Sequence, residues 1–197
     1  MPRLGDHDQR RRQIAEAVWR IASTRGLEDV SLRKVATEAG VSLRLVQYYF
    51  GTRDDLLLGS LEILNQETCK HVPQDTTPRE ILRTLLLGLL PLDDDSRMRY
   101  LVHLAYFVRS LSDPVLAAAF GARTPELERL TAGLLARGQD GGAVHEDFDP
   151  VPEAELLITI VDGLRTSIIT GRRSAEDAGA LIDHQLNRLF SRANVAI

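Results

Sequence analysis

Apolar residues recur at helical spacing along nearly the whole chain, and no segment alternates apolar and polar residues as a half-buried strand would. Glycine, proline and capping serine residues divide this pattern into separate helices. The sequence therefore predicts an all-α fold of about nine helices, with a kink near Pro125 in the seventh. The expected helices cover residues 8–25, 32–39, 43–49, 52–70, 78–90, 97–111, 112–137, 153–170 and 174–191.

Charge is distributed unevenly between the two ends of the chain. The first 53 residues carry ten Lys and Arg against six Asp and Glu, although the whole chain has a formal net charge of -4. A basic N-terminal part followed by an acidic body is typical of a nucleic-acid-binding head on a separate domain, although a solvated surface gives the same pattern.

Three residues near the N-terminus predict a helix-turn-helix. Ala36 is small enough for two helices to cross closely, Gly40 suits a left-handed turn, and Val46 anchors the next helix. Ser31 and Ser42 stand where they would cap the second and third helices. An ordinary helical hairpin is the alternative interpretation of this spacing.

The third helix carries side chains suited to reading a DNA duplex. Leu43, Arg44, Gln47 and Tyr48 fall mainly on the side opposite the apolar Val46 and Phe50. Arg can form two hydrogen bonds with guanine and Gln two with adenine, whereas Tyr and Ser can bind phosphate oxygens. A solvated helix face with half-buried tyrosines is the competing interpretation.

The stretch from Ser31 to Phe50, SLRKVATEAGVSLRLVQYYF, followed by GTRDDLL, resembles the DNA-binding head of the TetR family of bacterial regulators. The first helix, with its Ile14–Ala17 segment and terminal Gly26, is similar as well. The resemblance is specific over about residues 10–58 and beyond that covers only the number and length of helices, apart from a weaker similarity of residues 161–164 to the family's dimer-forming region.

The resemblance assigns further DNA contacts and implies a repressor that a small-molecule effector releases from its operator. It implies that Arg33 reaches a base or phosphate, that Tyr49 stands where a phosphate-binding His is common, and that Arg53 replaces a phosphate-binding Lys. Arg44 and Gln47 depart from the usual residues, so a relative's operator cannot be transferred. The expected DNA contacts are Ser31, Arg33, Ser42, Leu43, Arg44, Gln47, Tyr48, Tyr49 and Arg53.

Two domains are expected: a DNA-binding domain over residues 1–52 and a ligand-binding and dimerisation domain over 53–197. The last two helices carry wide apolar arcs, which could face the chain's own core or a second copy. The resemblance implies a four-helix bundle between two chains, so a homodimer reading a palindrome is expected. The predicted interface residues are Leu157, Ile160, Val161, Leu164, Ile168, Leu186 and Leu189.

Aromatic and polar side chains in the middle of the chain suggest a site for a small-molecule effector that releases the DNA. For any single one of these residues, plain core packing is the commoner explanation. The predicted pocket residues are Leu61, Asn65, Tyr100, His103, Leu104, Phe107 and Phe120.

Other functional classes find little support in the sequence. The single Cys69, with His71 nearby, lacks a third catalytic partner, and the five histidines do not pair at metal-ligand spacing. The acidic run 93–95 could suggest a metal or polyphosphate site, but its place in a loop before a helix favours a capping role. We expect no catalytic residue, metal or cofactor, no membrane span, and a cytoplasmic location. The alternative function is a helical small-ligand carrier or interaction module without operator specificity.

Overall fold

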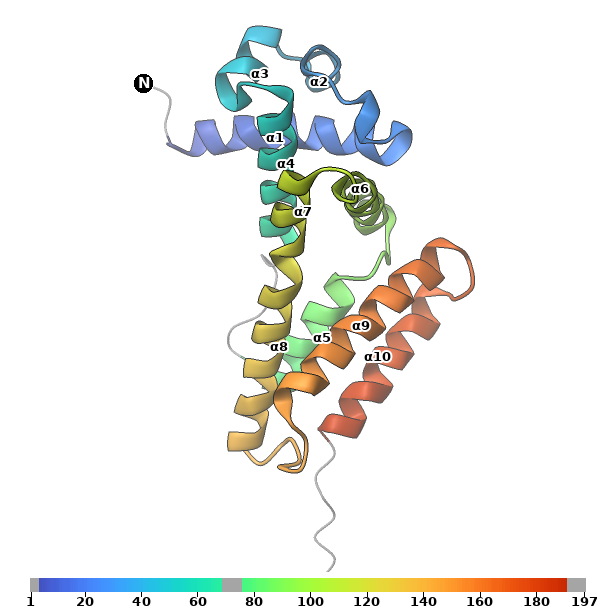
Figure 1. Ribbon diagram of the computed structural model, residues 1–197. Coiled ribbons are helices and arrows are strands. Elements are labelled where there is room, and N and C mark those ends of the chain that lie inside the picture. The colour runs from blue at the N-terminus through green and yellow to red at the C-terminus, as the bar shows by residue number, and fades with distance from the viewer. Residues whose placement is uncertain (1–3, 69–75, 191–197) are drawn as a thin grey trace, which may run out of the picture. The chain divides into compact units, whose positions relative to one another are not determined.

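The computed structural model describes residues 4–68 and 76–190, and every regular element in that part of the chain is helical (Figure 1). The predicted all-α fold is confirmed. The elements are α1 (Leu4–Arg25), the 3-10 helix η1 (Leu27–Asp29), α2 (Leu32–Ala39), α3 (Leu43–Phe50), α4 (Arg53–Thr68), α5 (Pro78–Gly88), α6 (Asp94–Ser110), α7 (Pro114–Gly121), α8 (Arg123–Asp140), α9 (Pro150–Ile169) and α10 (Ala175–Leu189).

The seventh predicted helix is two helices in the structure, α7 and α8, which meet at Ala122. Pro125 explains the position of the break, because proline has no N–H to donate to the carbonyl of Gly121, four residues earlier, and its ring crowds that carbonyl. The sequence placed a kink at this point, and the structure interrupts the helix completely.

The described residues form two compact units, which we describe separately. One contains residues 4–68 and 98–121, and the other contains residues 76–97 and 122–190. These units do not follow the predicted domain boundary after residue 52, because α4 packs against α1 and its Leu56, Leu57, Leu61 and Leu64 belong to the first unit's core. The division into functional domains at residue 52 stays a prediction.

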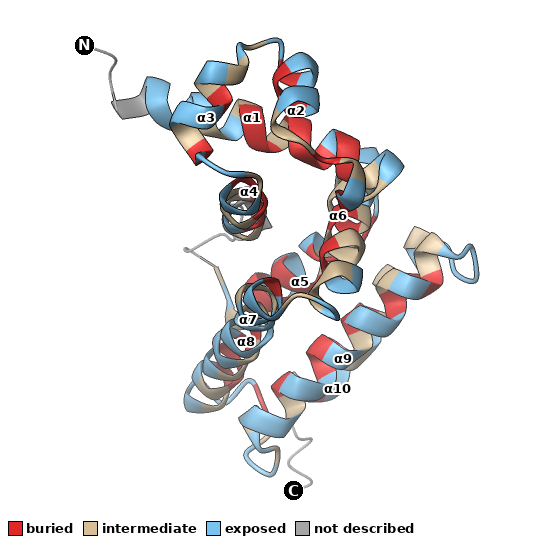
Figure 2. Ribbon diagram, turned by 45° about the horizontal axis from the view of Figure 1, so that its top comes forward, coloured by how far each residue is buried: buried red, intermediate tan, exposed pale blue. Residues whose placement is uncertain are grey.

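The first unit is built around α1, whose buried stripe includes Ile14, Val18 and Ile21. Figure 2 shows buried positions concentrated where α1 meets its neighbouring helices. Two polar side chains join this core at one point: the Tyr106 hydroxyl donates to the Leu57 carbonyl over 2.8 Å and lies 2.6 Å from Ser60 Oγ. Burial raises the pKa of the Tyr106 phenol well above its usual range.

The second unit is formed by α5, α8, α9 and α10. Thr77 and Glu80 form a reciprocal capping box that starts α5, with Pro78 in the first turn. Arg83 of α5 binds both carboxylate oxygens of Asp183 of α10, at 2.6 and 2.9 Å, and these hydrogen bonds hold the pKa of Asp183 below its usual range. Apolar faces of all four helices supply the core.

No helix in the described ranges is both long enough and apolar enough to cross a lipid bilayer.

Candidate nucleic-acid interface

Helices α2 and α3 are joined by a tight corner at Gly40, as the sequence predicts. Gly40 has φ 67° and ψ 33°, a left-handed conformation in which a side chain would be strained. Its N–H donates to the Thr37 carbonyl and the next N–H, of Val41, donates to the Ala36 carbonyl over 2.9 Å. These bonds end α2 and redirect the chain into α3 within three residues.

Both predicted serine caps are confirmed. Ser31 Oγ accepts from the Lys34 N–H and Ser42 Oγ accepts from the Leu45 N–H, over 3.3 and 3.2 Å. A capping hydroxyl accepts with its oxygen and keeps its own O–H, which remains available to a phosphate oxygen. Capping and the predicted DNA contact are therefore compatible at both serines.

Helix α3 separates its side chains by face. Val46 and Phe50 are buried in the first unit, whereas Arg44, Gln47 and Tyr48 are exposed, and Tyr48 is 74% exposed. Figure 1 shows α3 at the end of the unit, beyond α1. Leu43 and Tyr49 are half-buried and pack against the core, so they can offer only part of their side chains to a partner.

The Lys and Arg side chains of this region differ in whether they already form an ion pair with a carboxylate. Lys34 pairs with Asp29, which holds the pKa of that carboxyl below its usual range, and Arg20 pairs with Glu38 at 2.8 Å. Arg33 and Arg44 are exposed and have no carboxylate partner among the residues that the structure describes. Their charges are therefore available to an anionic ligand.

Arg53 is half-buried, with 32% of its side chain exposed, and it binds backbone acceptors of its own unit. Its guanidinium donates to the carbonyls of Val30 and Leu27, both over 2.8 Å, and so ties the start of α4 to the residues around η1. The phosphate contact expected at this position stays a prediction, with the guanidinium already committed to two backbone acceptors.

Two contacts that hold this surface in place could not be predicted from the sequence. Gln13 of α1 donates to the carbonyl of Ala39 at the end of α2 over 2.9 Å, and the ring of His7 meets that of Tyr49 at 4.7 Å between centroids. Both pairs bring residues together across 26 or more positions of the chain, and no local pattern indicates such contacts.

The predicted ligand residues all lie in the first unit, on α4, α6 and α7. Four of the rings make a continuous series, with centroid distances of 6.3 Å from Tyr100 to His103, 4.5 Å from His103 to Phe120, and 6.0 Å from Phe120 to Phe107. Leu61 and Tyr100 are buried, Phe107 is 45% exposed, and Asn65, His103, Leu104 and Phe120 are intermediate. The series is equally suited to packing or to contacting a small ligand, so the pocket stays a prediction.

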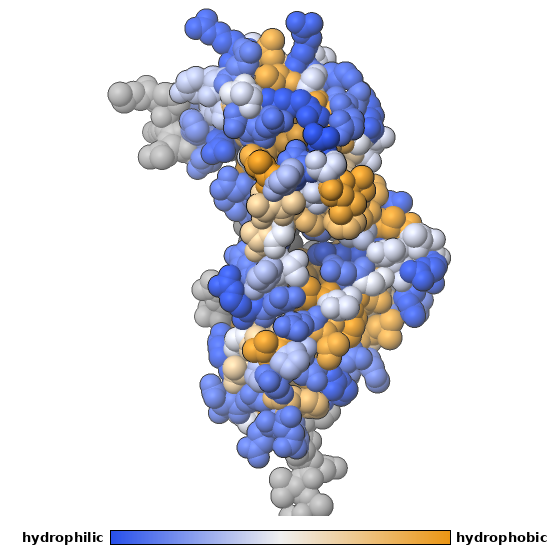
Figure 3. Space-filling model, viewed as in Figure 1, coloured by the Kyte–Doolittle hydropathy of each residue, from blue (hydrophilic) through white to orange (hydrophobic). Residues whose placement is uncertain are grey.

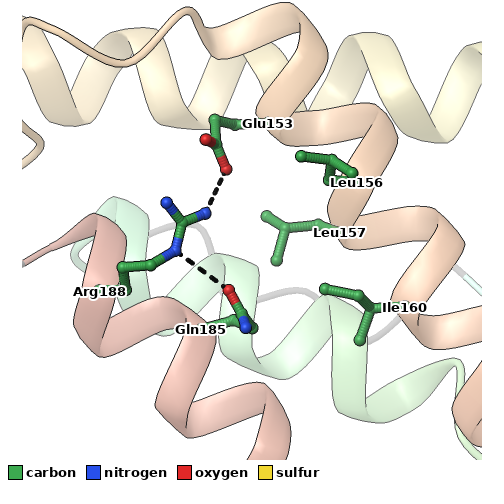
Figure 4. A pocket seen from close by; sticks show the side chains of 6 residues that line it. All are labelled: Glu153, Leu156, Leu157, Ile160, Gln185 and Arg188. Carbon is green, nitrogen blue, oxygen red and sulfur yellow. Dashed lines mark hydrogen bonds and ion pairs between the residues drawn. The ribbon is translucent and has the colours of Figure 1, made fainter.

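Most of the predicted dimer residues are buried in the chain's own core. Five of the seven are buried in the second unit, and Ile160 and Ile168 are half-buried. A hollow of about 310 Å³ lies between α9 and α10, and its wall includes the 53%-exposed Leu156. Figure 4 shows Leu156, Leu157 and Ile160 on one side of the hollow and Arg188 on the other. The Arg188 guanidinium binds Glu153 at 2.5 Å and Gln185 at 3.2 Å.

In the part of the chain that the structure describes, no three His, Cys, Asp or Glu side chains gather where they could hold a metal ion. Asp93 accepts from the Ser96 N–H over 2.7 Å, which agrees with the capping role expected of the acidic run. Cys69 and His71 lie outside the described residues.

Comparison with known proteins agrees with this geometry. Residues 14–59 match the model of the tetR family of bacterial regulatory proteins, and residues 78–191 match the BetI-type transcriptional repressor, C-terminal model. The HTH-type transcriptional regulator PksA of Bacillus subtilis is 31% identical over 170 residues, which is 83% of this chain and 80% of that protein.

Solved structures share the fold. A transcriptional regulator from Rhodococcus sp. Rha1 is 27% identical with a TM-score of 0.76, over 95% of this chain and 99% of its own. A regulator from Saccharomonospora viridis, solved in complex with choline, has a TM-score of 0.76 at 24% identity, over 90% of this chain and 95% of its own. With a matched model over more than half of its length, the chain belongs to the tetR family of bacterial transcriptional regulators.

Proposed function

We propose that this chain is a repressor that binds a palindromic operator as a homodimer and releases it when a small molecule binds. The observation that carries the proposal is the exposed face of α3, where Arg44, Gln47 and Tyr48 project from a helix fixed by the left-handed Gly40. A helix of this kind fits the major groove and presents its outer face to base edges. Membership of a regulator family supports the same function.

Loss of either reading side chain should alter sequence preference as well as affinity. We expect Arg44→Ala and Gln47→Ala each to cost about 1–3 kcal/mol of discrimination at one base pair of each half-site. Selection of bound duplexes from a random library, followed by titration of the selected site and its single-base variants, measures this directly. Arg129→Ala, an exposed arginine of α8 in the second unit, is the matched control. Variants that keep the wild-type preference would rule out direct readout.

The proposed dimer uses the outer side of α9 and α10. The apolar Leu156 and Ile160 border the hollow between these helices, and Figure 3 shows hydrophobic residues at the surface over the same part of the second unit. A two-fold contact between two such faces would cover them and would build a four-helix bundle. Dimerisation also supplies the spacing of roughly 34–36 Å between two reading helices that a palindrome requires.

A charge placed on this face should separate the two subunits. We expect Leu156→Glu to convert the protein to a monomer, because a carboxylate would have to be buried without a partner, and to weaken palindrome binding at least about tenfold. Sedimentation velocity and operator titration report the two effects. Leu130→Glu, at an exposed leucine of α8, is the control, and a Leu156→Glu variant that stays dimeric would contradict the proposed interface.

The proposed effector site is the ring series of α6 and α7. Aromatic faces attract organic cations, so the series from Tyr100 to Phe107 gives a reason to test small quaternary ammonium compounds first. The structural neighbour that holds choline supports the same choice. An effector releases DNA only to the extent that it binds the two states of the protein differently. Release of labelled operator by a panel of metabolites, choline included, tests the assignment.

A further inference from the structure

His7 contacts the helix-turn-helix through Tyr49, but it belongs neither to the hydrophobic core nor to the expected DNA contacts. It lies near the start of α1, four positions before Arg11, whose guanidinium lies over the Phe50 ring. The side chain of His7 is 49% exposed. Among the described residues its ring neighbour is Tyr49 of α3, at 4.7 Å between centroids in an edge-to-face arrangement. An edge-to-face contact favours one orientation of the imidazole although half of the side chain faces solvent.

The contact continues onto Tyr48, which is 74% exposed. Tyr49 meets Tyr48 edge-to-face at 5.2 Å, so His7, Tyr49 and Tyr48 form a row of rings from the first turns of α1 to the reading face. Figures 1 and 2 both place the N-terminal turns of α1 beside α3. The row therefore extends the candidate DNA-binding surface beyond the helix-turn-helix.

The polar atoms of the imidazole are largely uncommitted. Nδ1 lies 3.9 Å from a carboxylate oxygen of Asp8, whose side chain is 84% exposed, and no described residue hydrogen-bonds Nε2. Asp8 on its own helix and the Tyr49 phenol from α3 are the titratable groups facing the ring, with Asp6 and Arg10 as charged neighbours along α1. Of these residue types only histidine ordinarily changes charge between pH 5 and 8.

We propose that His7 is a DNA-contacting residue whose imidazole binds a backbone phosphate beside the C-terminal half of α3. The inference rests on the proposed function, since it needs a duplex lying against Tyr48. An N–H of the ring donates to the phosphate oxygen, and the protonated ring adds one positive charge to the contact.

His7→Phe is the informative variant, because it keeps a ring against Tyr49 and removes both nitrogens. Titration of the selected operator should show roughly three- to tenfold weaker binding than wild type at pH 6, with a salt slope smaller by about 1. The difference should shrink as the pH is raised to 8.5. The matched control is His145→Phe, a histidine that also lies beside an aspartate and a phenylalanine but in the second unit.

Two outcomes would overturn the phosphate contact while leaving the proposed function intact. His7→Phe could bind operator like wild type at every pH and salt concentration, or it could bind more weakly by the same factor at every pH with an unchanged salt slope. In both cases Arg44→Ala would still lose sequence preference. Failure of the wild-type protein to bind any duplex would instead contradict the proposed function itself.

Discussion

Replacing Arg53 with lysine is expected to destabilise the first unit by about 2–3 kcal/mol, although the positive charge at the start of α4 is preserved. The planar guanidinium reaches the carbonyls of Val30 and Leu27 at the same time, both over 2.8 Å. An ammonium on an unbranched stem cannot match this fork, so at least one half-buried carbonyl loses its charged donor. Arg53→Ala should cost as much or slightly more.

The same pair of variants separates a structural role for Arg53 from the phosphate contact that the family resemblance implies. If Arg53 binds phosphate, lysine should keep the affinity and the salt slope, and alanine should lower the slope by about 1 without affecting stability. If Arg53 supports the fold, both variants should lower stability and leave the slope unchanged. Trp19, the single tryptophan of the chain, is buried in the first unit, so its fluorescence during urea unfolding follows this unit.

Unchanged urea midpoints for both Arg53 variants, with a lower salt slope for alanine alone, would show that the two carbonyl contacts contribute little. Arg33→Ala is a suitable companion, because that side chain is exposed and lacks a carboxylate partner in the described ranges. We expect it to leave the urea midpoint unchanged and to weaken operator binding. The comparison sets a half-buried arginine that binds two carbonyls against an exposed one in the same unit.

The helix-turn-helix could be predicted from sequence because its determinants are local. Each serine cap, at Ser31 or Ser42, and the left-handed turn at Gly40 depends only on residues within five positions of itself. The structure confirms all three features. The start of α1 could not be placed in the same way. The helix begins at Leu4, before its apolar stripe, and the polar first turns give no periodic signal to detect.

The sequence pattern could not predict two things: the direction of a side chain, and whether an apolar face is buried within the chain or against a second copy. Arg53 occupies the position expected for a phosphate ligand, but its direction is decided by carbonyls 23 and 26 residues away in sequence. The apolar arcs of the last two helices correctly indicated burial. Periodicity cannot say whether the burial occurs in the chain's own core or against a second copy, and Leu157, Val161 and Leu186 are buried within the chain.

Two glycines of α8 should respond oppositely to the same substitution. A methyl group at Gly138 would lie 2.6 Å from Val144 Cγ2 and 3.1 Å from the Phe190 ring, whereas one at Gly133 would meet nothing within 4 Å. Alanine is favoured over glycine inside a helix by about 1 kcal/mol. We therefore expect Gly133→Ala to stabilise the second unit by up to about 1 kcal/mol. This variant is the matched control for Gly138→Ala.

At Gly138 the crowding should outweigh that gain, because Val144 is itself buried and held close by its N–H bond to the Gly138 carbonyl over 3.1 Å. Overpacking typically costs about 1–3 kcal/mol, so after the gain in helix propensity Gly138→Ala should destabilise the second unit by up to about 2 kcal/mol in total. Chemical unfolding followed by far-ultraviolet circular dichroism measures both variants. Adding Val144→Ala removes the clashing methyl groups, so the double variant should lose less stability than the two single changes predict together. Strict additivity would mean that the turn after α8 moves aside without cost.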